Sequence, residues 1–277
     1  MDQEITHNFQ WHQAENAVIG CILSVIVISR EESMKPKKVT TVRSFGLFAL
    51  LGATLAGLVC LGSASQAQDT KTPYPSMAPL EQYLMDHDAE IALARTAAPP
   101  SISQDAEVMV LGRRGYENAV KGKNGFVCMV ERSWTADLDD PDFWNPKLRA
   151  PICFNPPAVR SQVLLTVKKT EVILASQSKD RMAEAVKAAF EKKELPTPEA
   201  GAMCYMMSKQ QYLGDANEHW HPHLMFFLPL LTDPAIWGAN QDGSPVIEIN
   251  DPLGQLALFL IPVRRWSDGT ADPVIQH

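Results

Sequence analysis

The sequence lacks the motifs that identify the commonest nucleotide-binding and hydrolytic enzymes. It contains no phosphate-binding glycine loop, no Gly-x-Ser-x-Gly nucleophile turn and no His-Glu-x-x-His zinc motif. It also has no internal repeat and no low-complexity tract. Nothing therefore places the chain among the P-loop NTPases, the α/β-hydrolases or the helical zinc proteases. Any chemistry has to be sought in less regular patterns.

Basic residues are scarce as well. The chain has 25 lysines and arginines against 32 acidic residues, which gives a net charge of −7. No stripe of lysine and arginine runs along it. Because nucleic-acid phosphates are bound by positively charged surfaces, we expect no nucleic-acid partner.

Residues 34–67 have the organisation of a secretory signal peptide. Basic residues follow Met34, an apolar run extends from Phe45 to Leu61, and small residues predominate from Gly62 to Ala67. We prefer cleavage after Ala67 to cleavage after Ala64, because charge resumes directly afterwards. We therefore expect the protein to be periplasmic or secreted.

Residues 1–33 do not fit this organisation, because a signal peptide should begin the chain that it exports. The simplest account is that translation starts at Met34 and that residues 1–33 are a mistaken extension of the protein. The other interpretation is a genuine extension with an apolar stretch, Ala17 to Ile28, which is too short to span a bilayer.

The apolar run of the leader is close to the length that spans a bilayer, so a retained membrane anchor is the rival interpretation. Its glycines and the cleavage-like residues after it favour removal. After removal we expect no stable membrane insertion. Residues 68–277 are then expected to form a single domain, since their length suits one hydrophobic core.

Three cysteines lie beyond the predicted leader: Cys128, Cys153 and Cys204. In an oxidising compartment two of them are expected to form a disulfide bond. Three pairings are open on spacing alone, and we prefer Cys128 with Cys153 because it closes the shortest loop. Cys204 is then either a buried small hydrophobe or a reactive thiol.

The hydrophobic pattern predicts an α+β fold with about three helices and a largely antiparallel sheet. One helix is expected between Pro79 and Pro99, and two more over 159–174 and 179–193. Strands are expected over 106–111, 126–132, 202–207, 223–228, 245–249 and 256–263. Residues 133–157 are predicted to be a loop because they contain five prolines.

The most specific functional pattern is His219-Trp220-His221-Pro222-His223. In an extended chain the three imidazoles would share one side and Trp220 would take the other. Alternate residues lie about 6.6 Å apart, so two rings could bind one ion, whereas three would need a bent strand. Imidazole suits zinc, copper or iron, so the identity of the ion stays open, with zinc or copper as the first candidates. Asp215 or Glu218 could be a further ligand or a general base. The competing interpretation is a polar strand start whose histidines are merely hydrogen-bonded or solvated.

Two other functions remain open. In the first, the tryptophan-rich loop 133–157 binds a small molecule or a partner protein without catalysis. Tryptophans that only cover a core are the competing interpretation. In the second, Cys204 and either His221 or His223 form the thiol–imidazole pair of a hydrolase. No family signature surrounds Cys204, and burial or disulfide bonding competes with this role.

Five segments are spread over most of residues 72–270: Tyr74-Pro75-Ser76-Met77-Ala78-Pro79-Leu80-Glu81, Asn124-Gly125-Phe126-Val127-Cys128, Pro151-Ile152-Cys153-Phe154-Asn155-Pro156-Pro157, Gly201-Ala202-Met203-Cys204-Tyr205-Met206 and His219-Trp220-His221-Pro222-His223. Through these segments the chain resembles a group of uncharacterised exported bacterial proteins. The resemblance implies export and a single domain, but it brings no activity from which a catalytic role could be transferred.

Overall fold

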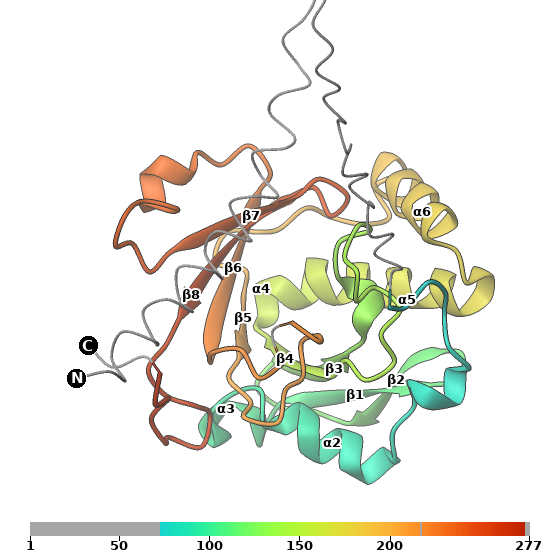
Figure 1. Ribbon diagram of the computed structural model, residues 1–277, viewed down its shortest axis with the longest axis horizontal. Helices are drawn as coiled ribbons and strands as arrows, with labels where there is room; N and C mark the ends of the chain where they lie inside the picture. The colour runs from blue at the N-terminus through green and yellow to red at the C-terminus, as the bar shows by residue number, and fades with distance from the viewer. Residues whose placement is uncertain (1–72, 217, 275–277) are drawn as a thin grey trace, which may run out of the picture. The chain divides into compact units, whose positions relative to one another are not determined.

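The computed structural model describes residues 73–216 and 218–274 (Figure 1). The predicted signal peptide and the segment before it lie outside these residues. Within the described ranges, no helix is both long enough and apolar enough to cross a membrane.

The described part of the chain is built on one eight-stranded sheet with the order β2-β1-β3-β4-β5-β6-β8-β7. Neighbouring strands are antiparallel, except that β1 and β3 run parallel. The sheet and the helices that cover it confirm the predicted α+β class with largely antiparallel strands. The strands are β1 Glu107–Gly112, β2 Gly115–Val120, β3 Val127–Glu131, β4 Ala150–Phe154, β5 Met203–Met206, β6 His223–Pro229, β7 Ile247–Asp251 and β8 Leu256–Pro262.

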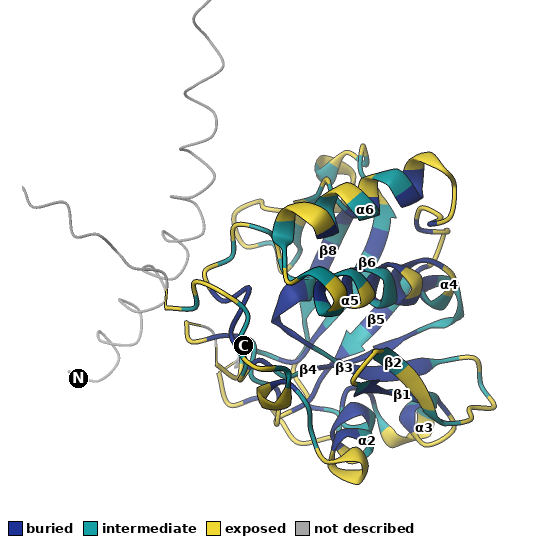
Figure 2. Ribbon diagram, turned by 90° about the vertical axis from the view of Figure 1, so that its right-hand side faces the viewer, coloured by how far each residue is buried: buried dark blue, intermediate teal, exposed yellow. Residues whose placement is uncertain are grey.

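Helices cover both faces of the sheet. On one face lie α2 (His87–Arg95) and α3 (Pro100–Ser103), and on the other lie α5 (Leu164–Ser176) and α6 (Lys179–Glu191) (Figure 1). A short α4 (Pro156–Ala158) and a π-helical turn (Val159–Val163) lead into α5. Successive residues of a strand face opposite sides of the sheet, so the core has one part on each side. Cys128 and Val130 pack with α2, while Met129 packs on the opposite face with residues of α4 and the π-helical turn. Figure 2 shows the resulting buried layer in the middle of the domain.

The first predicted helix is interrupted. Leu80–Gln82 form a single 3₁₀ turn, and α2 begins only after Asp86. The Asp86 carboxylate accepts the main-chain N–H groups of Asp88 and Ala89, so it caps a new helix instead of continuing the old one. The two pieces pack into different parts of the core, Tyr83 with Trp134 and Phe143 and Ala94 with Cys128 and Val130, so the helical spacing across residues 80–94 did not correspond to one helix.

The loop predicted for residues 133–157 was only partly right. It contains β4, which lies between β3 and β5 in the middle of the sheet. β2, at one edge, was not predicted either. The rest of the segment is irregular but ordered, because Trp134, Phe143 and Trp144 are buried in the core.

A buried ion pair joins α2 to Arg132, which directly follows β3, and Arg132 in turn contacts the turn that precedes α2. The guanidinium of Arg132 lies 2.9 Å from the carboxylate of Glu90, and both side chains are at most 1% exposed. Arg132 Nε also donates to the main-chain oxygen of Tyr83 at 2.8 Å. The same Glu90 oxygen accepts the N–H of Leu111 in β1 at 3.1 Å. One charge pair therefore connects four separate segments of the chain.

Candidate functional site

The histidine segment lies between the end of β5 and the start of β6. Only His223 belongs to a strand, and residues 219–222 are irregular. The alternation expected for an extended segment does not hold at Trp220. Trp220 is not on the far side from the imidazoles, since its ring centroid lies 5.6 Å from that of His221 and 4.8 Å from that of His223.

All three imidazoles use the same ring nitrogen to contact the protein. His219 Nδ1 bonds to the main-chain oxygen of Gln211, and His223 Nδ1 bonds to the main-chain oxygen of His221 at 2.7 Å. His221 Nδ1 lies 2.6 Å from a carboxylate oxygen of Asp272. A carbonyl oxygen can only accept, so Nδ1 carries the hydrogen in His219 and His223. In the neutral rings Nε2 then keeps its lone pair, and this is the form that binds a metal ion.

The three rings differ in their access to solvent. His219 is exposed, the side chain of His221 is 20% exposed and His223 is buried. Burial lowers the pKa of His223 to about 4, because a charged imidazole would be removed from water there. His223 is therefore neutral in the folded protein at ordinary pH.

Asp272 is a member of the site that the sequence did not reveal. Its side chain is only 2% exposed, and it follows β8 in a turned segment closed by the pair Arg265 and Ala271. The N–H of Ser267 bonds to the main-chain oxygen of Met207 at 2.9 Å, which holds this segment against the chain after β5. Asp272 stands 51 positions beyond His221, and no local pattern marks it.

Gln211 is the second residue that the sequence did not reveal. It is fully buried, and its side-chain amide donates to the main-chain oxygen of Trp220. Its own main-chain oxygen accepts a hydrogen bond from His219 Nδ1. Gln211 thereby holds the first half of the histidine segment at two points. Its Oε1 is buried and has no hydrogen-bond partner among the described residues.

Asp215 and Glu218, the acidic residues proposed as further ligands, have separate surroundings. Asp215 accepts the hydroxyls of Tyr74 and Tyr212 and lies 3.4 Å from Lys147 Nζ. The hydrogen bond from Tyr212, followed by that from Tyr74, holds the pKa of Asp215 at about 2. Asp215 therefore connects Tyr74 and Lys147 to the loop before His219. Glu218 is exposed, with a left-handed backbone (φ 38°).

Across the described ranges, no group of three or more His, Cys, Asp or Glu side chains is arranged to hold a metal ion. His219, His221 and His223 therefore do not form a ready three-ligand cluster. Binding by one or two of these imidazoles is untested by this arrangement, and the predicted metal site stays a prediction.

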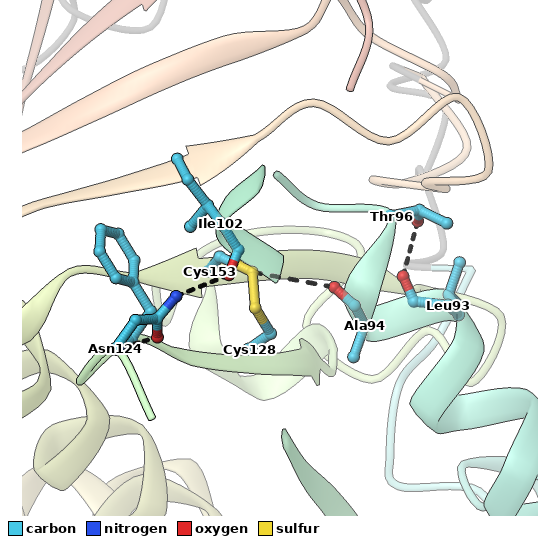
Figure 3. Close-up of a disulfide and its surroundings, with 8 residues drawn as sticks. Leu93, Ala94, Thr96, Ile102, Asn124, Cys128 and Cys153 are labelled. Carbon is cyan, nitrogen blue, oxygen red and sulfur yellow. Dashed lines mark hydrogen bonds between the residues drawn. A yellow bond between two sulfur atoms is a disulfide. The ribbon is translucent and has the colours of Figure 1, made fainter. Parts of the chain in front are cut away.

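The predicted disulfide bond between Cys128 and Cys153 is confirmed. The two residues are direct partners on β3 and β4, with a Cα–Cα distance of 4.0 Å. Figure 3 shows the bond beside Ala94 of α2, on the face of the sheet that α2 covers. This disulfide fits a periplasmic or extracellular protein.

Cys204 lies on β5, opposite Phe154 of β4 and Met225 of β6, and it is completely buried. Burial raises the pKa of its thiol well above the ordinary value. A nucleophilic cysteine needs the opposite shift, since the thiolate is the reactive form. This environment argues against the thiol–imidazole hypothesis, which an alkylating probe on the native protein would test.

The tryptophans of the 133–157 segment lie in the core. Trp134 is fully buried and its indole N–H donates to Thr170 Oγ1 at 2.9 Å, and Trp144 is 5% exposed. Three of the exposed large apolar side chains in the described ranges lie in the connection after β6, and the others are Leu164, Ile249 and Val274. Leu231 is 95% exposed, Ile236 is 79% exposed and Trp237 is 37% exposed. We call these three residues the β6–β7 apolar patch.

A second polar cluster lies beneath α5. Glu131 accepts Thr166 Oγ1 at 2.7 Å and Thr135 Oγ1 at 3.4 Å. Lys169 Nζ lies 3.8 Å from the carboxylate of Asp251 and donates to the main-chain oxygen of Thr135. Burial raises the pKa of Glu131. Its carboxyl group is satisfied by protein donors, so we interpret this cluster as structural.

Replacing Glu131 with glutamine is expected to stabilise the protein at about pH 8 and to have little effect near pH 4. The raised folded-state pKa favours the protonated form, so this group's contribution to stability is present in acid and is lost as pH rises through that pKa. Glutamine stays neutral and can still accept from Thr166. Urea unfolding at both pH values measures the difference. Glu117→Gln, on an exposed position of β2, is the control, and an equal pH response in both variants would contradict the prediction.

Comparisons with protein-family models, with curated proteins and with solved structures give no significant match to this chain. The function therefore has to be argued from the contacts of the site.

Proposed function

We propose that this chain is an exported metal-binding protein in which His221 is the principal ligand and one neighbouring imidazole, His219 or His223, is the second. The observation that carries the proposal is the shared use of Nδ1 by all three rings. Metal-binding histidines commonly donate their other ring N–H to a carboxylate or a backbone carbonyl, which orients the ring and leaves one nitrogen for the ion.

The choice of His221 as principal ligand follows from its surroundings. Its ring is held by a buried carboxylate, and it keeps part of its surface accessible. His219 is more exposed, whereas His223 is almost fully covered. Imidazole nitrogen suits zinc and copper equally, so both ions belong in the test. Water or a bound substrate would fill the remaining coordination positions.

The test is elemental analysis of the full chain, purified after dialysis against zinc or copper. We expect about one ion per chain in the wild type, as for a single mononuclear site. His221→Ala is expected to lose that ion. The matched control is His87→Ala, because His87 is an exposed histidine on α2 that lies outside the segment. A wild type without stoichiometric metal, or equal metal in both variants, would contradict the proposal.

A second candidate function is binding of a partner protein through the β6–β7 apolar patch. The observation that favours it is the nearly complete exposure of Leu231 and Ile236. Isolated apolar side chains are common on surfaces, but three exposed ones on a single connection favour an interaction site. Leu231→Ser with Ile236→Ser would remove the patch without touching the histidine segment, so the two functions can be separated.

A further inference from the structure

We infer that Asp272 is a positioning residue that fixes the protonation pattern of the His221 ring, with hydrogen on Nδ1 and a lone pair on Nε2. The inference deepens the proposed function and rests on it only for the metal affinity. The state of the ring is a property of the metal-free protein and can be measured separately.

The contact that carries the inference is short and shielded. His221 Nδ1 and Asp272 Oδ2 are 2.6 Å apart, and the carboxylate is 2% exposed. An ionised carboxylate only accepts hydrogen bonds, so the nitrogen that faces it must carry hydrogen. Placing the lone pair of Nδ1 against the carboxylate would put two acceptors together in a buried position.

The main chain fixes the carboxylate in turn. The N–H of Val274 donates to Asp272 Oδ1 at 3.1 Å, and the N–H of Asp272 donates to the main-chain oxygen of Arg264 at 2.9 Å. Asp272 Oδ1 is thus occupied, which leaves Oδ2 for the imidazole. Each oxygen of the carboxylate accepts a different hydrogen bond, so the carboxylate cannot rotate without losing one of these two bonds.

Asparagine at this position distinguishes positioning from simple packing. In Asp272→Asn the side-chain oxygen can keep the bond from Val274, so the NH₂ group then faces His221. An NH₂ group donates a hydrogen bond, so Nδ1 of His221 has to accept it and must be unprotonated. The ring hydrogen is then on Nε2. The variant therefore keeps the shape of the site and removes the lone pair that a metal ion needs.

The experiment has two arms, both with the full chain. The first records the ¹⁵N chemical shifts of the His221 ring in metal-free protein at a pH where the imidazole is neutral. We expect hydrogen on Nδ1 in the wild type and on Nε2 in Asp272→Asn. The second arm titrates zinc into both proteins, and we expect the variant to bind about 10–100-fold more weakly, as for other lost orienting partners.

Asp268→Asn is the control, because Asp268 belongs to the same segment, is exposed and bonds to Thr270 and Lys209 instead of a histidine. It should leave both the ring shifts and the affinity unchanged. Hydrogen on Nε2 in the wild-type ring would overturn the inference, even if Asp272→Asn did not fold. A wild type with the expected ring state but no zinc binding would overturn only the proposed function.

Discussion

Replacing Arg132 with methionine is expected to lower the free energy of unfolding by about 3–5 kcal/mol. The substitution would leave the Glu90 carboxylate, which is 1% exposed, without the guanidinium 2.9 Å away. It would also remove the donor to the main-chain oxygen of Tyr83. An uncompensated buried charge is costly, and protonation of Glu90 would offset only part of that cost.

Urea unfolding near neutral pH measures this change. The control is Arg113→Met, because Arg113 pairs with Glu81 at 3.0 Å on the surface, where both side chains are more than half exposed. Exposed pairs contribute about 0–1 kcal/mol. The double variant Arg132→Met with Glu90→Leu should recover much of the loss, since it removes both charges. If Arg132→Met costs no more than Arg113→Met, the ion pair does not hold the four segments together.

Removal of the disulfide is expected to cost about 3–4 kcal/mol on the chain-entropy model, because the bond joins residues 25 positions apart. The variant carries Cys128→Ala together with Cys153→Ala, so that no free thiol replaces the bond. The wild type should lose a similar amount in a reducing agent, and the double variant should not respond to that agent. Cys204→Ala is the control. It should keep the wild-type sensitivity to reduction, because Cys204 lies outside the disulfide. Equal stability of the oxidised and reduced wild type would contradict the prediction.

Local patterns predicted most of the fold. The two long helices and the strands after residue 200 were found because their apolar residues recur at helical or alternating spacing. The break before α2 had a readable local signal, since Asp86 is a favourable helix cap. β2 was missed because it is an edge strand with exposed positions at Glu117 and Asn118.

β4 was missed because Pro151 argues against a central strand. The structure accommodates this proline in a gap of the ladder. β4 pairs with β5 only at Cys153 and Phe154, and the next bridge on that side is at Arg149. Position 151 therefore faces no β5 residue that would need its N–H group. Such a gap depends on how three distant segments meet, and a sequence window does not contain it.

The site was predictable to the extent that it is local. The histidine motif is visible in five consecutive residues, but only His223 belongs to a strand and the ring of Trp220 lies beside that of His223. Asp272 and Gln211 reach the histidines through the path of the chain after β8 and after β5. A single aspartate or glutamine has no signature of its own, so only the folded arrangement identifies them.

The order of the strands in the sheet determines how the sheet can be assembled while the chain is being synthesised. Except for the positions of β2 and β7, spatial order follows chain order from β1 to β8. A polypeptide synthesised from its N-terminus can therefore add almost every strand to a neighbour that already exists. His221 precedes β6, whereas Asp272 follows β8. The carboxylate of Asp272 is therefore synthesised only after all eight strands. Until then, the growing chain contains His221 without the group that orients its ring.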